Sequence, residues 1–175
     1  MSVPVILITG PVGVGKTAAL GEATELLEAA GVPFAAVDLD GLSWCYPTPA
    51  GDDRFRSGLT LRNLAGVWRN FADAGARRLV LARVVEARAE LQRYRDAVPG
   101  AEIVVARLRA SDATLQERIA RRELGLGRAW HAARARELAS LMDSARVEDF
   151  MVETDGRDVN AIAREILTRA GWLAA

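Results

Sequence analysis

A short segment near the start of the chain combines glycines, a lysine and a threonine at a spacing that suits phosphate chemistry. Residues 10–17 fit the pattern G-x-x-x-x-G-K-[ST], which ends here in Lys16 and Thr17. Glycines let the backbone turn sharply and bring several N–H groups close to phosphate oxygens, and the hydroxyl after the lysine can bind Mg²⁺. The segment is therefore predicted to bind a nucleoside triphosphate with Mg²⁺. The residues expected to contact the phosphates are Gly10, Pro11, Val12, Gly13, Val14, Gly15, Lys16, Thr17 and Ala18.

Lys16 is the only lysine among the 23 lysine and arginine residues of the chain. A compact ammonium on a flexible stem fits between phosphate oxygens where a planar guanidinium does not. The lysine at this one place, in a chain that otherwise uses arginine, indicates that the position requires an ammonium. We predict that Lys16 contacts the β- and γ-phosphates and is catalytic, and that Thr17 is a metal ligand.

Asp38 and Asp40 stand where the second apolar run of the sequence ends. They are two residues apart, so both carboxylates should project from the same face of a strand end. In open α/β sheets, ligands bind at the carboxyl edge of the strands. We expect Asp38 to hold Mg²⁺ and Asp40 to accept a proton from an acceptor hydroxyl. The alternative is that the two residues only form a polar turn before Gly41.

Apolar, β-branched runs alternate with helical patterns along the chain, which is typical of βα units and a mostly parallel sheet. Residues 1–175 are expected to form one domain with the three-layer αβα architecture, a five-stranded sheet and helices on both faces. Strands are predicted at 3–9, 34–39, 78–84, 102–108 and 150–153. Helices are predicted at 16–30, 59–74, 86–96, 111–123, 129–145 and 158–169, with a break at 124–127.

The composition excludes several classes of function. Acidic and basic residues balance at 23 each, so no nucleic-acid or membrane surface is expected to act through bulk charge. Cys45 and His131 are the only cysteine and histidine, so one chain can build neither a disulfide nor a Cys/His zinc site. No segment suits a signal peptide or a membrane span. We expect a cytoplasmic protein, monomeric or homodimeric, with a small molecule as its partner.

The arrangement of these motifs resembles the nucleoside-monophosphate-kinase-like group of P-loop kinases, which includes shikimate, gluconate, adenylylsulfate and chloramphenicol kinases. In that group the Walker A loop opens the chain, as residues 8–17 do here, and acidic residues end the second strand, as Asp38 and Asp40 do. A fourth strand leads to a helix ending in arginines and a small helical lid, resembling residues 104–122.

The resemblance implies roles for the arginines around a lid at about 118–136. Arg118 would lie against the adenine of ATP, and Arg122, with Arg121 or Arg128, would reach the phosphates when the lid closes. Arg122 is therefore a candidate catalytic residue, together with Lys16 and Asp40. Guanidinium groups stack on aromatic faces and fork onto phosphate, so the chemistry permits these roles. The alternative for each arginine is a solvated helix face.

The substrate loop, at about 40–58, departs from the known enzymes. Residues 51–56 resemble the Gly-Glu-x-x-Phe-Arg segment of shikimate kinases, but Leu59 replaces the acid that follows there, and the third strand lacks the glycine cluster of those enzymes. A shikimate kinase is therefore not predicted. Trp44 is a candidate cover for the acceptor, whereas His131 is expected to be an exposed helical residue.

Taken together, these residues predict an ATP- and Mg²⁺-dependent phosphotransferase that acts on a hydroxyl or phosphate of a small molecule. The alternative is a nucleotide-dependent regulatory NTPase or switch without an acceptor. The guanine-reading pattern Asn-Lys-x-Asp, which many such switches carry, is absent, because no second lysine exists.

Overall fold

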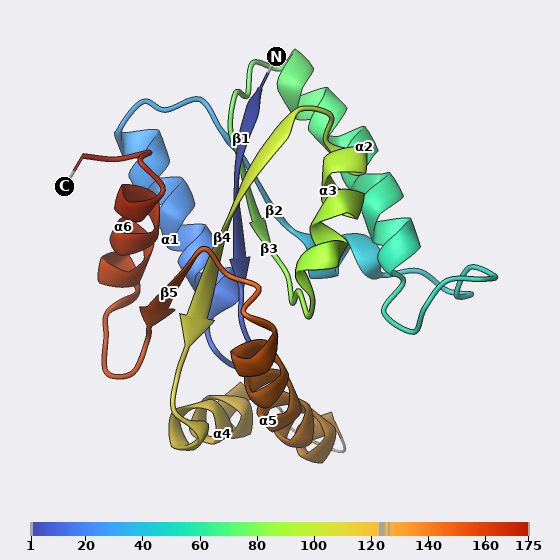
Figure 1. The fold of residues 1–175 in the computed structure, drawn as a ribbon, viewed down its shortest axis with the longest axis vertical. Helices are drawn as coiled ribbons and strands as arrows, with labels where there is room; N and C mark the ends of the chain where they lie inside the picture. The colour runs from blue at the N-terminus through green and yellow to red at the C-terminus, as the bar shows by residue number, and fades with distance from the viewer. Residues whose placement is uncertain (1, 123–124, 126, 175) are drawn as a thin grey trace.

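A parallel five-stranded sheet runs through the part of the chain that the computed structural model describes, residues 2–122, 125 and 127–174 (Figure 1). The strand order is β2-β3-β1-β4-β5, and every neighbouring pair is parallel. The five-stranded αβα prediction is thus confirmed, with a sheet that is parallel throughout. The strands are β1 (Val3–Thr9), β2 (Ala35–Asp38), β3 (Leu79–Ala82), β4 (Ala101–Arg109) and β5 (Phe150–Glu153).

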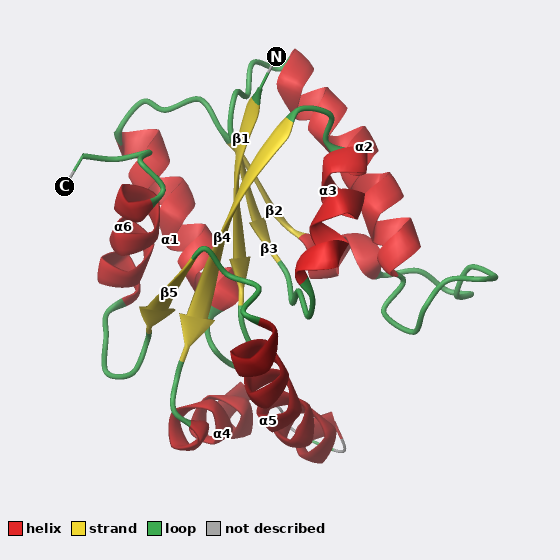
Figure 2. Cartoon of the chain, in the orientation of Figure 1, coloured by secondary structure: helices red, strands yellow, loops and turns green. Residues whose placement is uncertain are grey.

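Helices cover both faces of the sheet and one of its ends (Figure 2). One face carries α1 (Lys16–Ala29) and α6 (Val159–Arg169), which pack against each other. The other face carries α2 (Ser57–Asp73) and α3 (Leu91–Ala97). Two further helices, α4 (Asp112–Arg122) and α5 (Gly127–Ala145), pack together below the carboxyl ends of the strands (Figure 1).

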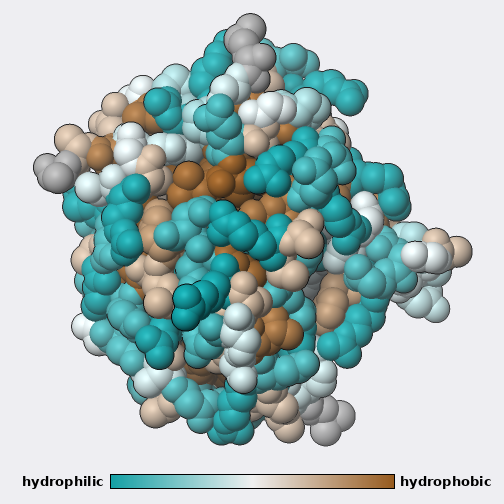
Figure 3. Space-filling model, viewed as in Figure 1, coloured by the Kyte–Doolittle hydropathy of each residue, from teal (hydrophilic) through white to brown (hydrophobic). Residues whose placement is uncertain are grey.

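Alternate residues of β1 supply the two halves of the core. Ile6 and Ile8 pack with α1 and α6, whereas Val5 and Leu7 pack with α2 and α3, and all four side chains are at most 2% exposed. Burial on both faces explains why the strand reads as an unbroken apolar run. On the surface, polar side chains surround apolar surface at the centre of the face shown in Figure 3.

The structure differs from the predicted elements mainly after the third strand. The predicted helix at 86–96 is shorter: a 3-10 turn, Arg88–Glu90, precedes α3, which begins at Leu91. The reason is local, because Glu90 Oε1 accepts the backbone N–H groups of Glu86 and Ala87, each at 2.8 Å, and so holds residues 86–87 in a non-helical turn.

Two sequence expectations about helices have different outcomes. The predicted break at 124–127 lies largely outside the described residues, which omit 123, 124 and 126. Among the helices that the structure describes, none combines the length and the apolar character needed to cross a membrane.

Candidate active site

The predicted phosphate loop connects the end of β1 to the start of α1, at the carboxyl edge of the sheet. Gly10 (φ 144°) and Gly15 (φ 104°) have backbone conformations that favour glycine. A Cβ at Gly10 would stand 2.6 Å from the carbonyl oxygen of Leu108 in β4, whereas a Cβ at Gly15 would meet no atom within 4 Å. The loop is therefore pressed against β4 at its start and open at Gly15, where α1 presents its N-terminus to an incoming phosphate.

Lys16 folds its ammonium back over the loop. Its Nζ donates to the carbonyl oxygens of Gly10 at 3.0 Å and Pro11 at 3.1 Å. Burial of the amine lowers the pKa of Lys16 to about 8, against the raising effect of the charges of Asp40 and Asp38. The positive charge of Arg122 lowers this pKa further. Lys16 thus lies in an environment that a bound triphosphate, with its negative charge, would complement.

Thr17, Asp38 and Asp40 are linked by hydrogen bonds. Thr17 Oγ1 donates to Asp38 Oδ2 at 2.7 Å, and the backbone N–H of Asp40 donates to Asp38 Oδ1 at 3.1 Å. The second bond caps the 3-10 helix Leu39–Ser43 that follows β2. The hydrogen bond between Thr17 and Asp38 brings the hydroxyl and the carboxylate into contact at the N-terminus of α1.

This pair suits Mg²⁺ bound together with phosphate. Within the described part of the chain, no group of three or more His, Cys, Asp or Glu side chains is placed to hold a metal ion. Mg²⁺ commonly takes one or two protein ligands and completes its shell with phosphate oxygens and water. The donor set of Thr17 and Asp38 fits that requirement.

A cavity of about 770 Å³ begins at the phosphate loop and extends well beyond it. One end is lined by loop and α1 residues, including Gly15, Lys16, Thr17 and Ala18. Asp40 lines the same space. The other end is lined by residues 54–57, by the segment that follows β3 and by α5. A cavity of this size accommodates a ligand as large as a nucleotide or a drug molecule.

The two catalytic candidates other than Lys16 line the cavity. Asp40 contributes the largest of the charge effects that raise the pKa of Lys16, which places its carboxylate near the ammonium. Arg122, at the end of α4, also lines the cavity, and its charge acts on Lys16. Both side chains are therefore within electrostatic reach of Lys16.

Arg118 is fixed in place by three hydrogen bonds. Its Nη1 donates to the carbonyl oxygen of Val14 and to Thr154 Oγ1, and its Nη2 donates to the carbonyl oxygen of Thr154, each at 3.0 Å. These bonds connect α4 to the phosphate loop and to the segment after β5. The guanidinium lines the cavity and is held rigidly, as a stacking surface for a base requires.

The remaining lid arginines lie elsewhere. Arg121 pairs with Glu117 at 2.5 Å on an exposed side of α4. Arg128 is exposed near the start of α5 and is not among the residues that line the cavity. Of the two arginines that the resemblance paired with Arg122, the structure brings neither to the cavity.

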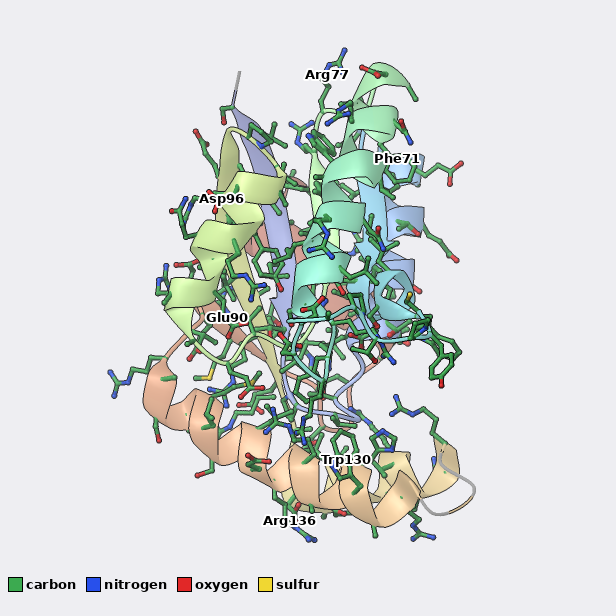
Figure 4. All side chains as sticks on the ribbon, turned by 90° about the vertical axis from the view of Figure 1, so that its right-hand side faces the viewer. Phe71, Arg77, Glu90, Asp96, Trp130 and Arg136 are labelled. Atoms are coloured by element: carbon green, nitrogen blue, oxygen red, sulfur yellow. The ribbon has the colours of Figure 1, made fainter. Side chains whose placement is uncertain are left out.

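Aromatic side chains line the cavity at a different place from the one expected. Trp44 is 88% exposed and lies outside the cavity. Trp130 of α5 lines the cavity instead and points from the helix toward the rest of the molecule, whereas Arg136 points away (Figure 4). His131 is half-buried, with its ring 4.9 Å from that of Trp130, and it also lines the cavity. The expectation for Trp44 was wrong, because its side chain is exposed to solvent outside the cavity. The expectation for His131 was wrong because the first half of α5 lines the cavity.

Sequence reasoning assigned no role to two buried arginines of the cavity, Arg83 and Arg134. Arg134 pairs with Glu86 and, at 2.8 Å, with Glu137. Arg83 follows β3 directly and is 8% exposed. A charged residue at the carboxyl end of a parallel strand was the signal available for Arg83, the same signal that singled out Asp38.

Comparison with known proteins places the fold. No protein-family model matches the sequence, and no curated protein sequence matches it. The structure is similar to a gluconokinase from Sinorhizobium meliloti 1021, with 22% identity, coverage of 98% of this chain and 93% of that one, and a TM-score of 0.61.

Two further solved structures are similar to this chain over nearly its whole length. One is the tunicamycin resistance protein of Deinococcus radiodurans, with 14% identity, 97% of each chain covered and a TM-score of 0.67. The other is the APS kinase of Mycobacterium tuberculosis, solved with AMPPNP and APS, with 23% identity, 95% of this chain and 96% of that one covered, and a TM-score of 0.63. Sheet order, phosphate loop and these likenesses together show that the chain has the fold of the P-loop small-molecule kinases.

Proposed function

We propose that the protein is an ATP- and Mg²⁺-dependent kinase that transfers the γ-phosphoryl group to a hydroxyl or phosphate of a small molecule. The observation that carries the proposal is the extent of the cavity. It holds the phosphate loop at one end and continues past Asp40 into a space lined by Phe55, Arg83 and Trp130, which leaves room for an acceptor beside the triphosphate. The similar gluconokinase and APS kinase, which share the fold, support the same class of reaction.

Each side chain around the loop has a role in this reaction. Thr17 and Asp38 would hold Mg²⁺, which when bound draws negative charge from the phosphate oxygens. Lys16 and Arg122 would stabilise the charge that develops on the transferred group. Arg118 would support the adenine ring. Gly10, Pro11, Val12, Gly13, Val14, Gly15 and Ala18 would surround the phosphates, and Arg128 would contact them only after α5 moves.

For a hydroxyl acceptor, Asp40 would act as the general base. It would take the hydroxyl proton while the acceptor oxygen forms a bond to the γ-phosphorus and the bond from that phosphorus to the bridging oxygen of ADP breaks. The products are the phosphorylated acceptor, ADP and a proton carried by Asp40. For a phosphate acceptor the attacking oxygen is already ionised, and Asp40 would serve only to position it.

The rival is a regulatory NTPase without an acceptor. A switch of that kind has no use for the end of the cavity that lies beyond the phosphate loop, which weighs against it. Cytoplasmic location, a monomeric or homodimeric state and the absence of nucleic-acid and membrane partners stay predictions from the sequence.

The test is an acceptor screen followed by turnover. Candidate acceptors are screened by thermal shift with a non-hydrolysable ATP analogue and Mg²⁺ present, because a ligand that binds the folded state raises its melting temperature. Compounds that raise it are then assayed for ADP release and for the phosphorylated product. Acceptor-dependent ADP release with product formed supports the kinase. Slow ATP hydrolysis that no acceptor in the screen accelerates would favour the switch.

A further inference from the structure

The short segment between β3 and α3 is held in place by hydrogen bonds to its backbone. The N–H of Val85 donates to Thr9 Oγ1 at 2.9 Å, and Thr9, the last residue of β1, is fully buried. Glu90 Oε1 accepts the backbone N–H groups of Glu86 and Ala87, each at 2.8 Å. Because Thr9 directly precedes the phosphate loop, the segment is connected to the strand end that carries this loop.

Two side chains of this segment hold α5 and the loop that follows it. Glu86 pairs with Arg134, in the N-terminal half of α5. Arg88 pairs with Asp149 at 2.6 Å and donates to the carbonyl oxygen of Val147 at 3.1 Å. The segment therefore contacts α5 at one point along its N-terminal half and the chain at a second point just beyond its C-terminal end.

Arg134 has two acidic partners, and only one of them belongs to another element. The side chain of Arg134 is 8% exposed although it carries a charge. Glu137, at 2.8 Å, lies three residues further along the same helix and is 61% exposed, so this pair cannot connect α5 to the rest of the chain. Glu86 is 48 residues away in sequence. Since removal of one partner from a buried ion pair leaves an uncompensated charge, the contact with Glu86 should determine where this half of α5 lies.

The ion pair lies where α5 lines the cavity. Glu86 and Arg134 both line it, and so does Trp130, about one turn earlier in the helix. The guanidinium of Arg134 also lies 5.7 Å from the ring centre of Phe55, in the loop before α2. A movement of this half of α5 would therefore change the end of the cavity beyond the phosphate loop.

We propose that Glu86 is a positioning residue, whose ion pair with Arg134 sets the place of the N-terminal half of α5 and so the shape of the acceptor end of the cavity. The part of this inference that concerns the acceptor rests on the proposed kinase function. Glu86 acts through Arg134 and not on the reacting atoms. Without its charge the helix is free to move away from the cavity, so the acceptor binds more weakly, whereas the phosphate loop still holds ATP.

The first experiment measures hydrogen exchange in the protein without ligands. The variants are Glu86→Gln, which keeps the size and removes the charge, Arg134→Gln and the double variant. Glu137→Gln is the matched control, because it removes the other acidic partner of the same arginine. We expect each of the first two variants to accelerate exchange of the amides of 127–136 by about tenfold, and the double variant to exchange no faster than Arg134→Gln. Glu137→Gln should stay within about twofold of the wild type.

Several outcomes of this experiment would overturn the proposal. Unchanged exchange of 127–136 in Glu86→Gln would do so, and so would an equal effect of Glu137→Gln, because Arg134 would then act only within its own helix. Effects that add in the double variant would show that the two residues act independently. Faster exchange throughout the sheet would show a loss of global stability instead of a local movement. Should Arg134→Gln fail to fold, Arg134→Lys, which keeps the charge and loses the planar fork of donors, completes the same cycle.

The second experiment uses turnover and separates this inference from the kinase proposal. With an acceptor found by the thermal-shift screen, ADP release gives kcat and the KM values for the acceptor and for ATP. We expect Glu86→Gln to raise the KM for the acceptor by about tenfold or more, and to change kcat and the KM for ATP by less than about threefold. An unchanged KM for the acceptor would overturn the positioning role and leave the kinase intact. Coupled exchange effects of Glu86 and Arg134 in a protein that transfers no phosphoryl group would overturn the kinase alone.

Discussion

At the scale of single residues, the carboxylates of Asp38 and Asp40 stand in different surroundings although they are two residues apart. Both oxygens of Asp38 accept hydrogen bonds, one of them from the proposed metal ligand Thr17. Asp40 instead lines the cavity near Lys16. These surroundings favour the metal role for Asp38 and the acceptor proton for Asp40, and they predict that the two residues fail in different ways when changed.

Asp40→Asn should lower acceptor-dependent turnover by roughly 10² to 10⁴ with little change in ATP affinity, because it removes only the proton acceptor. Asp38→Asn should weaken Mg²⁺ dependence and ATP affinity together, because the ion bridges the phosphates. The measurement is a pair of titrations, of Mg²⁺ and of ATP, with ADP release as the readout. Identical defects in both variants would contradict this division of roles.

The lowered pKa of Lys16 predicts a pH dependence of nucleotide binding. At about 8, the pKa lies within reach of experiment, and only the protonated amine attracts phosphate. ATP affinity should therefore hold below pH 8 and fall above it, approaching about tenfold per pH unit. Lys16→Arg, whose guanidinium does not titrate in this range, should bind ATP more weakly and without this pH dependence. Titration calorimetry from about pH 7 to 9.5 checks both, and a parallel fall in the two proteins would exclude Lys16 as the titrating group.

At the scale of elements, α5 is anchored at one end and approaches the cavity with the other. Arg107 of β4 is 2% exposed and pairs with Asp143, near the C-terminal end of α5, at 2.6 Å. The N-terminal half carries Trp130 and Arg134, which line the cavity. The C-terminal end of α5 is thus held against the sheet, whereas its N-terminal half lines the cavity.

Hydrogen exchange should reveal this difference within one helix. With AMPPNP and Mg²⁺, the amides of residues 127–136 should exchange more slowly, because a closed lid gains contacts to the phosphates. The amides of 137–145, held by Arg107, should change little and serve as an internal control. Equal protection of 127–136 with and without the nucleotide would show that this segment is not a lid.

At the scale of the whole molecule, the sheet joins the two helical layers through cores on both of its faces. β1 contributes to the cores on both faces, so neither layer can lose its packing without affecting the other. We predict a single cooperative unfolding transition, with coincident midpoints by near- and far-ultraviolet circular dichroism. Saturating AMPPNP should raise the melting temperature, because ligand binds only the folded state. Two separated transitions would mean that residues 1–175 do not form one domain.

Local sequence determined the fold and the residues of the phosphate loop and its surroundings. Strand and helix periodicity, the glycine spacing before Lys16 and the acids that end β2 are short-range features, and parallel strands bring their carboxyl ends to one edge by geometry alone. Lys16, Thr17, Asp38 and Asp40 could therefore be expected at one edge of the sheet from the order of the amino acids.

Only the tertiary structure decided the acceptor end. Most basic residues of the chain are arginines, and nothing in local sequence distinguishes the exposed Arg121 and Arg128 from the buried Arg134. The position of Arg83 after a strand marks it as a residue of the sheet edge but does not show what it contacts. Their surroundings depend on contacts far apart in the chain: Arg83 meets Ser57, 26 residues away, and Arg134 meets Glu86, 48 residues away. The packing of α2 and α5 around the end of the sheet sets those contacts. The periodicity of the sequence does not predict this packing. A long, flexible arginine side chain can reach several partners, so its contacts depend on which residues the folded chain places near it.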